Sequence, residues 1–176
     1  MSKMSGKGKN RIEVLETIMF TLKSDEIYDV LKYQEMSEQK IKQFMYQPLV
    51  RDLSKLFHSR GISKSDILAK HVVLWEGNKK TVVNNVVLFG VQHRPDFVVR
   101  LKDFTVAVEV KRGSNGQSIR EGIGQSIVYS MRYDYVVYLF IDCTPDKKLK
   151  ESLNEVDETW LLDELWKNHN VMFDIV

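Results

Sequence analysis

The chain has 176 residues, of which 43% are hydrophobic and 28% are charged, and its formal net charge is +2. This length is sufficient for one globular core, and the charge is too small to indicate a polyanionic partner by itself. The single cysteine, Cys143, excludes an internal disulfide framework and a zinc site with several thiolate ligands. Because no secretory signal and no run of about 18 apolar residues is found, we expect a cytoplasmic protein with no membrane partner.

The first part of the chain is expected to be helical. Residues 1–10 are basic and rich in Gly and Ser, which predicts a disordered tail before a single domain over residues 11–176. Apolar residues recur at helical spacing over 11–33, with a break at 23–25, so two short helices are expected there.

A longer amphipathic stretch follows these two helices. It begins after Ser37, which is a good N-cap, and ends at Gly61, which suits the residue after a helix. Pro48 lies inside this stretch, and two alternatives are open: one helix that kinks at Pro48, or a second helix that begins there.

Four stretches with the texture of β-strands come next, separated by turn signals at 77–78 and 92–95. They cover residues 71–77, 81–91, 94–101 and 104–111.

A helix and another strand follow. Ser114 and Gln117 have the spacing of a capping box and predict a helix that runs to about Met131. Gly122 and Gly124 are unfavourable in a helix interior, so we expect them to permit close packing on a sheet. The strand is expected in the apolar run over 133–142, and a helix between two buried strands implies that the strands are parallel.

The remainder is read as a charged linker over 145–157, a helix over 158–168 and a final strand over 171–176. Together these elements predict an α/β fold with a central mixed β-sheet flanked by helices.

Charged residues interrupt the two strands over 94–101 and 104–111. If Lys102 and Asp103 form the centre of a tight turn, Leu101 pairs with Phe104, and the same register puts Asp96 opposite Glu109. A slip by one residue would bury the charges among valines, which favours the first register. One face of the hairpin is then wholly apolar, with Phe97, Val99, Leu101, Phe104, Val106, Val108 and Val110.

The opposed carboxylates need a compensating cation, because like charges across a strand pair are unfavourable by about 0.2 to 1 kcal/mol. Lys111 lies on the same face as Glu109 and is one candidate, and a divalent metal ion is the other. Two converging carboxylates suit Mg²⁺, which would polarise a phosphodiester and lower the pKa of a bound water. Lys111 would then hold the attacking water or offset the charge that develops on the phosphate.

Three short motifs around this hairpin resemble a known family. Pro95-Asp96 followed by Glu109-Val110-Lys111 looks like the signature of the PD-(D/E)xK nuclease superfamily, whose fold is called restriction-endonuclease-like. The element order over about 37–142 is similar to the αβββαβ core of that fold, here with extra N-terminal helices. Gln125 and Tyr129 match the Q-x-x-x-Y element of some of its branches.

The resemblance implies a nuclease that uses Mg²⁺, with Mn²⁺ as a substitute, to hydrolyse DNA. It implies Asp96, Glu109, Lys111 and Gln125 as catalytic residues, and Asp96, Glu109, the Val110 carbonyl and Glu38 as metal ligands, with Glu35 as an alternative to Glu38. Arg94, Arg112 and Tyr129 are the corresponding candidates for contacts with nucleic acid. A homodimer is also plausible, since cutting both strands needs two sites.

Other interpretations of the same residues remain open. Asp96 can be a turn residue that caps local amides, and Glu109 and Lys111 can lie on an ordinary exposed sheet face. The whole chain can be a catalytically inactive module that binds nucleic acid or supports assembly, or a metal-free scaffold with no nucleic-acid partner.

Overall fold

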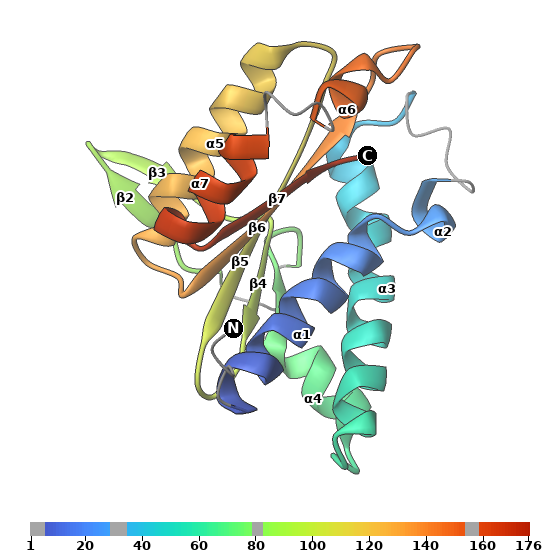
Figure 1. Ribbon diagram of the computed structural model, residues 1–176. Coiled ribbons are helices and arrows are strands. Elements are labelled where there is room, and N and C mark those ends of the chain that lie inside the picture. The colour runs from blue at the N-terminus through green and yellow to red at the C-terminus, as the bar shows by residue number, and fades with distance from the viewer. Residues whose placement is uncertain (1–5, 29–34, 79–82, 154–158) are drawn as a thin grey trace.

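A computed structural model of the chain describes residues 6–28, 35–78, 83–153 and 159–176 (Figure 1). Its centre is a five-stranded sheet in the order β1-β4-β5-β6-β7. The neighbours β1–β4 and β4–β5 are antiparallel, whereas β5–β6 and β6–β7 are parallel. The expected mixed sheet is therefore confirmed, with strands β1 (Val73–Trp75), β4 (Phe97–Arg100), β5 (Thr105–Gly113), β6 (Tyr135–Asp142) and β7 (Val171–Ile175).

Helices cover both faces of the sheet (Figure 1). One layer contains α1 (Gly6–Leu22), α3 (Glu38–Ser59) and α4 (Ser65–Val72), and the other contains α5 (Gly116–Ser130) and α7 (Thr159–His169). The short helices α2 (Asp25–Tyr28) and α6 (Lys148–Leu153) follow α1 and β6. None of the helices in these described ranges combines the length and apolar composition needed to cross a membrane.

Side chains alternate along β5, so this strand contributes to a hydrophobic core on each face of the sheet. Val106, Val108 and Val110 are fully buried on the side of α1 and α3, whereas Ala107 is buried on the side of α5. The face that the sequence marks as wholly apolar is thus the one that packs on the larger helical layer. β6 is buried along almost its entire length, as its long apolar run predicts.

The long helix α3 begins and ends where the sequence predicts. The Ser37 side chain accepts a hydrogen bond from the Lys40 amide, and Gly61 follows the helix with φ +82°. Pro48 lies within a single helix, so no second helix begins there. The expected break after α1 is confirmed, because α1 ends at Leu22 and α2 begins at Asp25.

Two predictions about the N-terminal and C-terminal segments need correction. Residues 6–10 belong to α1 and not to a disordered tail, while residues 1–5 lie outside the described residues. Once packing stabilises a helix, one more turn at its end is gained at little cost. Helix α6 lies within the stretch expected to be a linker, and its residue Leu153 is buried against the sheet.

Three further predictions are wrong in detail between residues 62 and 117. Helix α4 precedes β1 and takes the first residues of the expected strand over 71–77. The stretch expected as one strand over 81–91 contains β2 (Val86–Leu88) and the start of β3 (Val91–His93), which form a separate hairpin. The N-cap of α5 is Asn115, whose side chain accepts from the Ser118 amide, so the expected Ser114–Gln117 box is not formed.

The two glycines of α5 differ in what surrounds them, and this difference can be tested. A Cβ at Gly122 would lie 2.2 Å from the Tyr138 hydroxyl, whereas one at Gly124 would meet nothing within 4 Å. We expect Gly122→Ala to destabilise the protein by about 1 to 3 kcal/mol, because buried Tyr138 must move. Gly124→Ala should stabilise it by about 0.5 to 1 kcal/mol through helix propensity.

Urea unfolding of both variants measures this contrast, since each adds one methyl group to the same helix. Equal effects of the two substitutions would contradict the close approach of α5 to β6 at Gly122.

Candidate active site

The site lies where β4 begins and the second half of β5 runs beside it. Phe97 pairs with Val108, and continuing this register by one residue places Asp96 across from Glu109, as the sequence predicts. The two carboxylates are almost completely buried, with exposed fractions of 5% for Asp96 and 2% for Glu109. An ordinary solvent-exposed sheet face is therefore excluded for Glu109.

Both oxygens of Asp96 have partners. Oδ2 accepts a hydrogen bond of 2.8 Å from the Val110 amide, and Oδ1 accepts one of 2.6 Å from the Lys42 ammonium. Burial raises the pKa of Asp96, and the charge of Lys42 opposes this effect without cancelling it. Asp96 is therefore held by long-range contacts and does not act as a local turn cap.

Lys42 is the central residue of the site that sequence reasoning missed. It is 6% exposed, and its ammonium lies 2.6 Å from Glu38 Oε1 and 2.6 Å from Asp96 Oδ1. Burial disfavours its charge, but the two carboxylates outweigh this effect and raise its pKa. The signal was the i,i+4 spacing of Glu38 and Lys42 on one helix, next to the apolar stripe through Ile41 and Met45.

Glu109 is less well satisfied than Asp96. Its Oε1 lies 3.0 Å from the Lys111 ammonium, but its buried Oε2 has no hydrogen-bond partner of good geometry among the described residues. Burial and the neighbouring Asp96 raise the pKa of Glu109 to about 8. Below that pH Glu109 holds a proton, and above it the site carries an additional buried negative charge that favours a bound cation.

Lys111 joins the site from the same strand face. Its side chain is partly exposed, so the ammonium can reach both Glu109 and solvent. Burial is the largest influence and works against its charge, but the charge and hydrogen bond of Glu109, together with the charge of Glu38, outweigh burial and raise the pKa of Lys111. The sequence left open whether Lys111 or a metal ion compensates the charge of the two carboxylates. In this structure two lysines do so, with Lys42 beside Asp96 and Lys111 beside Glu109.

The remaining predicted ligands lie around this core. Glu38 reaches the site through Lys42, and its Oε2 accepts a 3.3 Å hydrogen bond from the Arg112 amide. Glu35 is exposed before the start of α3. The Val110 side chain is buried in the larger core, as expected of a residue that could offer only its backbone to the site.

The residues of the Q-x-x-x-Y element lie on α5, the helix that packs against β5 and β6. Gln125 Oε1 is buried without a hydrogen-bond partner in the described part of the chain. Burial, followed by the charges of Glu109 and Asp96, raises the pKa of Tyr129. Because Tyr129 is 1% exposed, it has little surface for the expected contact with nucleic acid.

The two arginines expected to contact nucleic acid differ in their surroundings. Arg94 donates to Asn85 Oδ1 at 2.7 Å and lies 3.6 Å from Glu76 Oε1. It therefore links the residue before β2 to the residue after β1, at the base of the β2–β3 hairpin. The guanidinium of Arg112 is half-buried and lies 3.3 Å from the Cys143 sulfur. Neither residue lies between the two carboxylates.

Some features of the site suit a divalent metal ion, and others oppose its binding. Two buried acceptor oxygens, Glu109 Oε2 and Gln125 Oε1, lack donors, and oxygen acceptors of this kind are what Mg²⁺ prefers. Within the described residues, however, no group of three or more His, Cys, Asp or Glu side chains is close enough together to hold a metal ion. The Lys42 ammonium occupies the space between Glu38 and Asp96, so the expected third carboxylate is held by a lysine.

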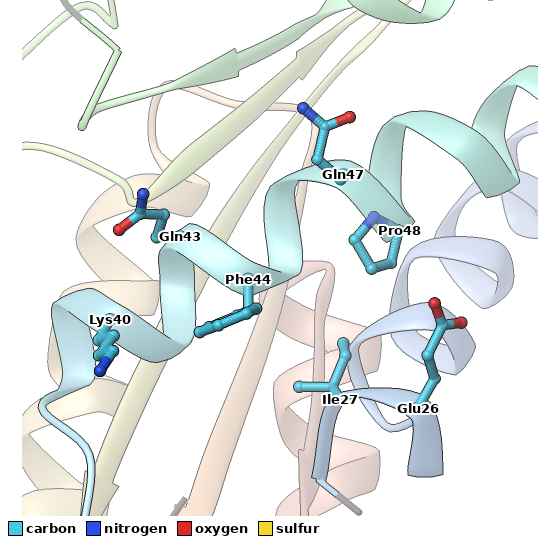
Figure 2. Close-up of a pocket in the computed structure, with 7 residues that line it drawn as sticks. All are labelled: Glu26, Ile27, Lys40, Gln43, Phe44, Gln47 and Pro48. Atoms are coloured by element: carbon cyan, nitrogen blue, oxygen red, sulfur yellow. The ribbon is translucent and has the colours of Figure 1, made fainter. Parts of the chain in front are cut away.

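A separate hollow of about 560 Å³ lies between α2 and α3 (Figure 2). Phe44 and Pro48 point into it from α3, and Ile27 and Glu26 approach from α2. It contains none of the candidate site residues and brings no two carboxylates together, so it offers no comparable chemistry.

Comparison of the chain with protein-family models, with curated proteins and with solved structures found no match. The assignment of a function therefore rests on the residues and their geometry.

Proposed function

We propose that this chain is a metal-dependent nuclease that hydrolyses phosphodiester bonds in DNA, with a site of the PD-(D/E)xK kind on a restriction-endonuclease-like core. The observation that carries the proposal is the buried pair Asp96, just before β4, and Glu109 on β5. Lys111 lies 3.0 Å from Glu109, and the other Glu109 oxygen has no partner among the described residues. A buried carboxylate oxygen without a donor destabilises the metal-free protein, and a functional ligand is a reason for keeping it.

The residues have distinct roles in this proposal. Asp96 and Glu109 would hold a Mg²⁺ or Mn²⁺ ion, with the Val110 carbonyl as a further ligand. Glu38 would join them only after the Lys42 ammonium moves out of the space between Glu38 and Asp96. The bound ion would polarise the scissile phosphodiester and lower the pKa of a water molecule. Lys111, which is partly exposed and cationic, offsets negative charge that develops on the phosphate. Gln125 and Tyr129 support the carboxylates from α5.

A second candidate function is a catalytically inactive module of the same architecture that binds nucleic acid or supports assembly. The observation that favours it is Lys42, because an internal ammonium already neutralises Asp96 at 2.6 Å. In such a module the lysine would replace the metal permanently. The two candidates differ in whether Mn²⁺ binds at the carboxylates.

The nuclease proposal predicts that Lys111→Ala reduces metal-dependent DNA cleavage by about 10²- to 10³-fold, because the charge beside the reacting phosphate is lost. The measurement is degradation of linear, circular, branched and single-stranded DNA with Mg²⁺ or Mn²⁺. Lys102→Ala is the matched control, since Lys102 is exposed in the β4–β5 turn and should be dispensable. Equal cleavage by wild type and Lys111→Ala on every substrate would remove Lys111 from the mechanism.

Calorimetric titration with Mn²⁺ separates the two candidate functions. Saturable binding that is lost in Glu109→Gln supports the nuclease, whereas salt-sensitive DNA binding without Mn²⁺ binding supports the inactive module. Sedimentation of the same samples tests the expected homodimer.

A further inference from the structure

The hairpin of β2 and β3 projects from the body of the molecule and ends in an apolar tip (Figure 1). Val86 anchors the hairpin under α5, where it packs in the same cluster as Ala107 and Tyr129. Beyond this anchor, Val87 and Val91 are more than half exposed, and Phe89 is 95% exposed. Within the described residues nothing covers this tip, so folding alone gains little from an aromatic residue there.

The backbone at the tip makes Phe89 still less favourable. Leu88 pairs with Val91, so Phe89 and Gly90 form a two-residue turn, and their φ angles are +50° and +77°. Turns with positive φ at both central positions favour Asn-Gly, because Asn tolerates the left-handed region better than an aromatic residue does. Phe89 is therefore disfavoured both by its exposure and by its backbone, which is the pattern of a residue retained for binding.

A cleft of about 450 Å³ opens at the base of the hairpin and is lined by two arginines, Arg100 and Arg132. The Tyr133 hydroxyl donates to the Asn84 carbonyl at 3.3 Å and joins the loop between α5 and β6 to the segment before β2. In the described part of the chain, neither arginine forms an ion pair and no carboxylate lines the cleft. Guanidinium groups without an acidic partner are suited to phosphate.

The cleft and the carboxylates share one face of the β4–β5 pair. Arg100 is four residues after Asp96, and strand alternation puts the two side chains on the same side. At about 3.3 Å per residue the separation along the strand is roughly 13 Å.

We infer that the β2–β3 hairpin and the cleft at its base bind a single-stranded segment of DNA, with Arg100 and Arg132 on phosphates and Phe89 stacked on a base. The inference rests on the proposed function for the choice of DNA as the ligand. An exposed aromatic side chain at the tip of the hairpin, with arginines at its base, is the combination that single-stranded nucleic acid requires.

The direct test is Phe89→Asn, with binding of a fluorescent oligothymidine and of a blunt duplex measured by anisotropy in EDTA. The variant should fold at least as well as wild type, because Asn suits the turn. Its affinity for the single strand should fall about 5- to 150-fold, the range expected for one lost base stack, with a smaller effect on the duplex. Phe20→Gln is the control, since Phe20 is 77% exposed on α1, away from the hairpin.

The arginines have a separate readout in the salt dependence of binding. Arg100→Ala and Arg132→Ala should each reduce the slope of log affinity against log salt by about 0.7, because each removes one phosphate contact. Lys70→Ala removes one exposed positive charge on α4 and should leave the slope unchanged.

Unchanged affinity of Phe89→Asn for the single strand would overturn the inference. So would a wild-type dimer that Phe89→Asn converts to a monomer without weakening DNA binding, since the apolar tip would then meet a second copy of the chain. Binding is measured without divalent metal, so the two proposals can fail separately. If single-strand binding depends on Phe89 but no DNA is cleaved, only the nuclease proposal is wrong. If DNA is cleaved but Phe89 has no role in binding, only the proposed single-strand site is wrong.

Discussion

Glu109→Gln should reduce metal-dependent DNA cleavage by about 10²- to 10³-fold while leaving the fold intact. The amide has the shape of the carboxylate but lacks the negative charge that would hold the ion, and a bound metal contributes several kcal/mol to the stabilisation of charge in phosphoryl chemistry. Glu109 is 2% exposed, and its Oε2 has no donor in the part of the chain that the structure describes, so the amide replaces a poorly satisfied group. The measurement is the initial cleavage rate with Mn²⁺.

The pH dependence of the free energy of unfolding provides the internal control for this variant. The pKa of Glu109 is raised from 4.5 to about 8 in the folded protein, so the folded state keeps a proton that the unfolded state releases. The contribution of Glu109 to the stability of the metal-free wild type should therefore be fully present below pH 4.5, be lost as the pH rises towards 8, and change no further above it. In Glu109→Gln this part of the decline should be absent, which urea unfolding in EDTA between pH 5 and 9 can measure.

Glu121→Gln is the matched substitution for both measurements. Glu121 is exposed on α5 and bonds only to the neighbouring Gln117 among the described residues, at 2.9 Å. It should cleave DNA and unfold as wild type does. If Glu109→Gln retains full metal-dependent cleavage, Glu109 is not a ligand of the catalytic ion.

Lys42→Met should destabilise the metal-free protein by about 3 to 5 kcal/mol at neutral pH, because removing one partner of a buried ion pair leaves the other charge uncompensated. Lys42 lies 2.6 Å from both Glu38 and Asp96, and Asp96 is 5% exposed. Methionine keeps most of the volume of the lysine, so a loss of packing contributes little. Denaturant unfolding measures the effect.

Two comparisons make this prediction specific. Lys40→Met changes an exposed lysine on the same helix and should alter stability by less than about 0.5 kcal/mol. Mn²⁺ should stabilise Lys42→Met more than wild type if the ion binds beside Asp96, since it would replace the missing cation. A loss below about 1 kcal/mol for Lys42→Met would show that Asp96 does not depend on this ion pair.

The local parts of the fold could be predicted from the sequence because they depend on short-range patterns. The period of two in the β4 and β5 stretches fixed the faces of the hairpin, and a slip of one residue would have buried Asp96 among valines. Ser37 and Gly61 marked the ends of α3 through backbone hydrogen bonds and φ angles that involve only neighbouring residues. The run over 133–142 identified a doubly covered strand by its composition.

The sequence also identified Glu38, Asp96, Glu109 and Lys111 as candidates. The structure places them in two ion-paired groups, Glu38 and Asp96 around Lys42 and Glu109 with Lys111, which meet where Asp96 lies across from Glu109. Their proximity within the β4–β5 pair follows from register alone. The proximity of Glu38 does not, because it depends on how α3 crosses the sheet.

The same physical reason explains what the sequence could not reveal. Lys42 is one turn along from Glu38, but only the packing of Ile41 and Met45 against the sheet turns its side chain towards Asp96, 54 residues away in the chain. The separate β2–β3 hairpin likewise depends on a turn at Phe89-Gly90 whose positive φ angles no aromatic residue would predict. The register of β4 and β5 and the ends of α3 were therefore determined by the sequence, whereas the buried lysine and the exposed aromatic tip were decided by tertiary packing, because helix orientation and long-range contacts set which side chains meet.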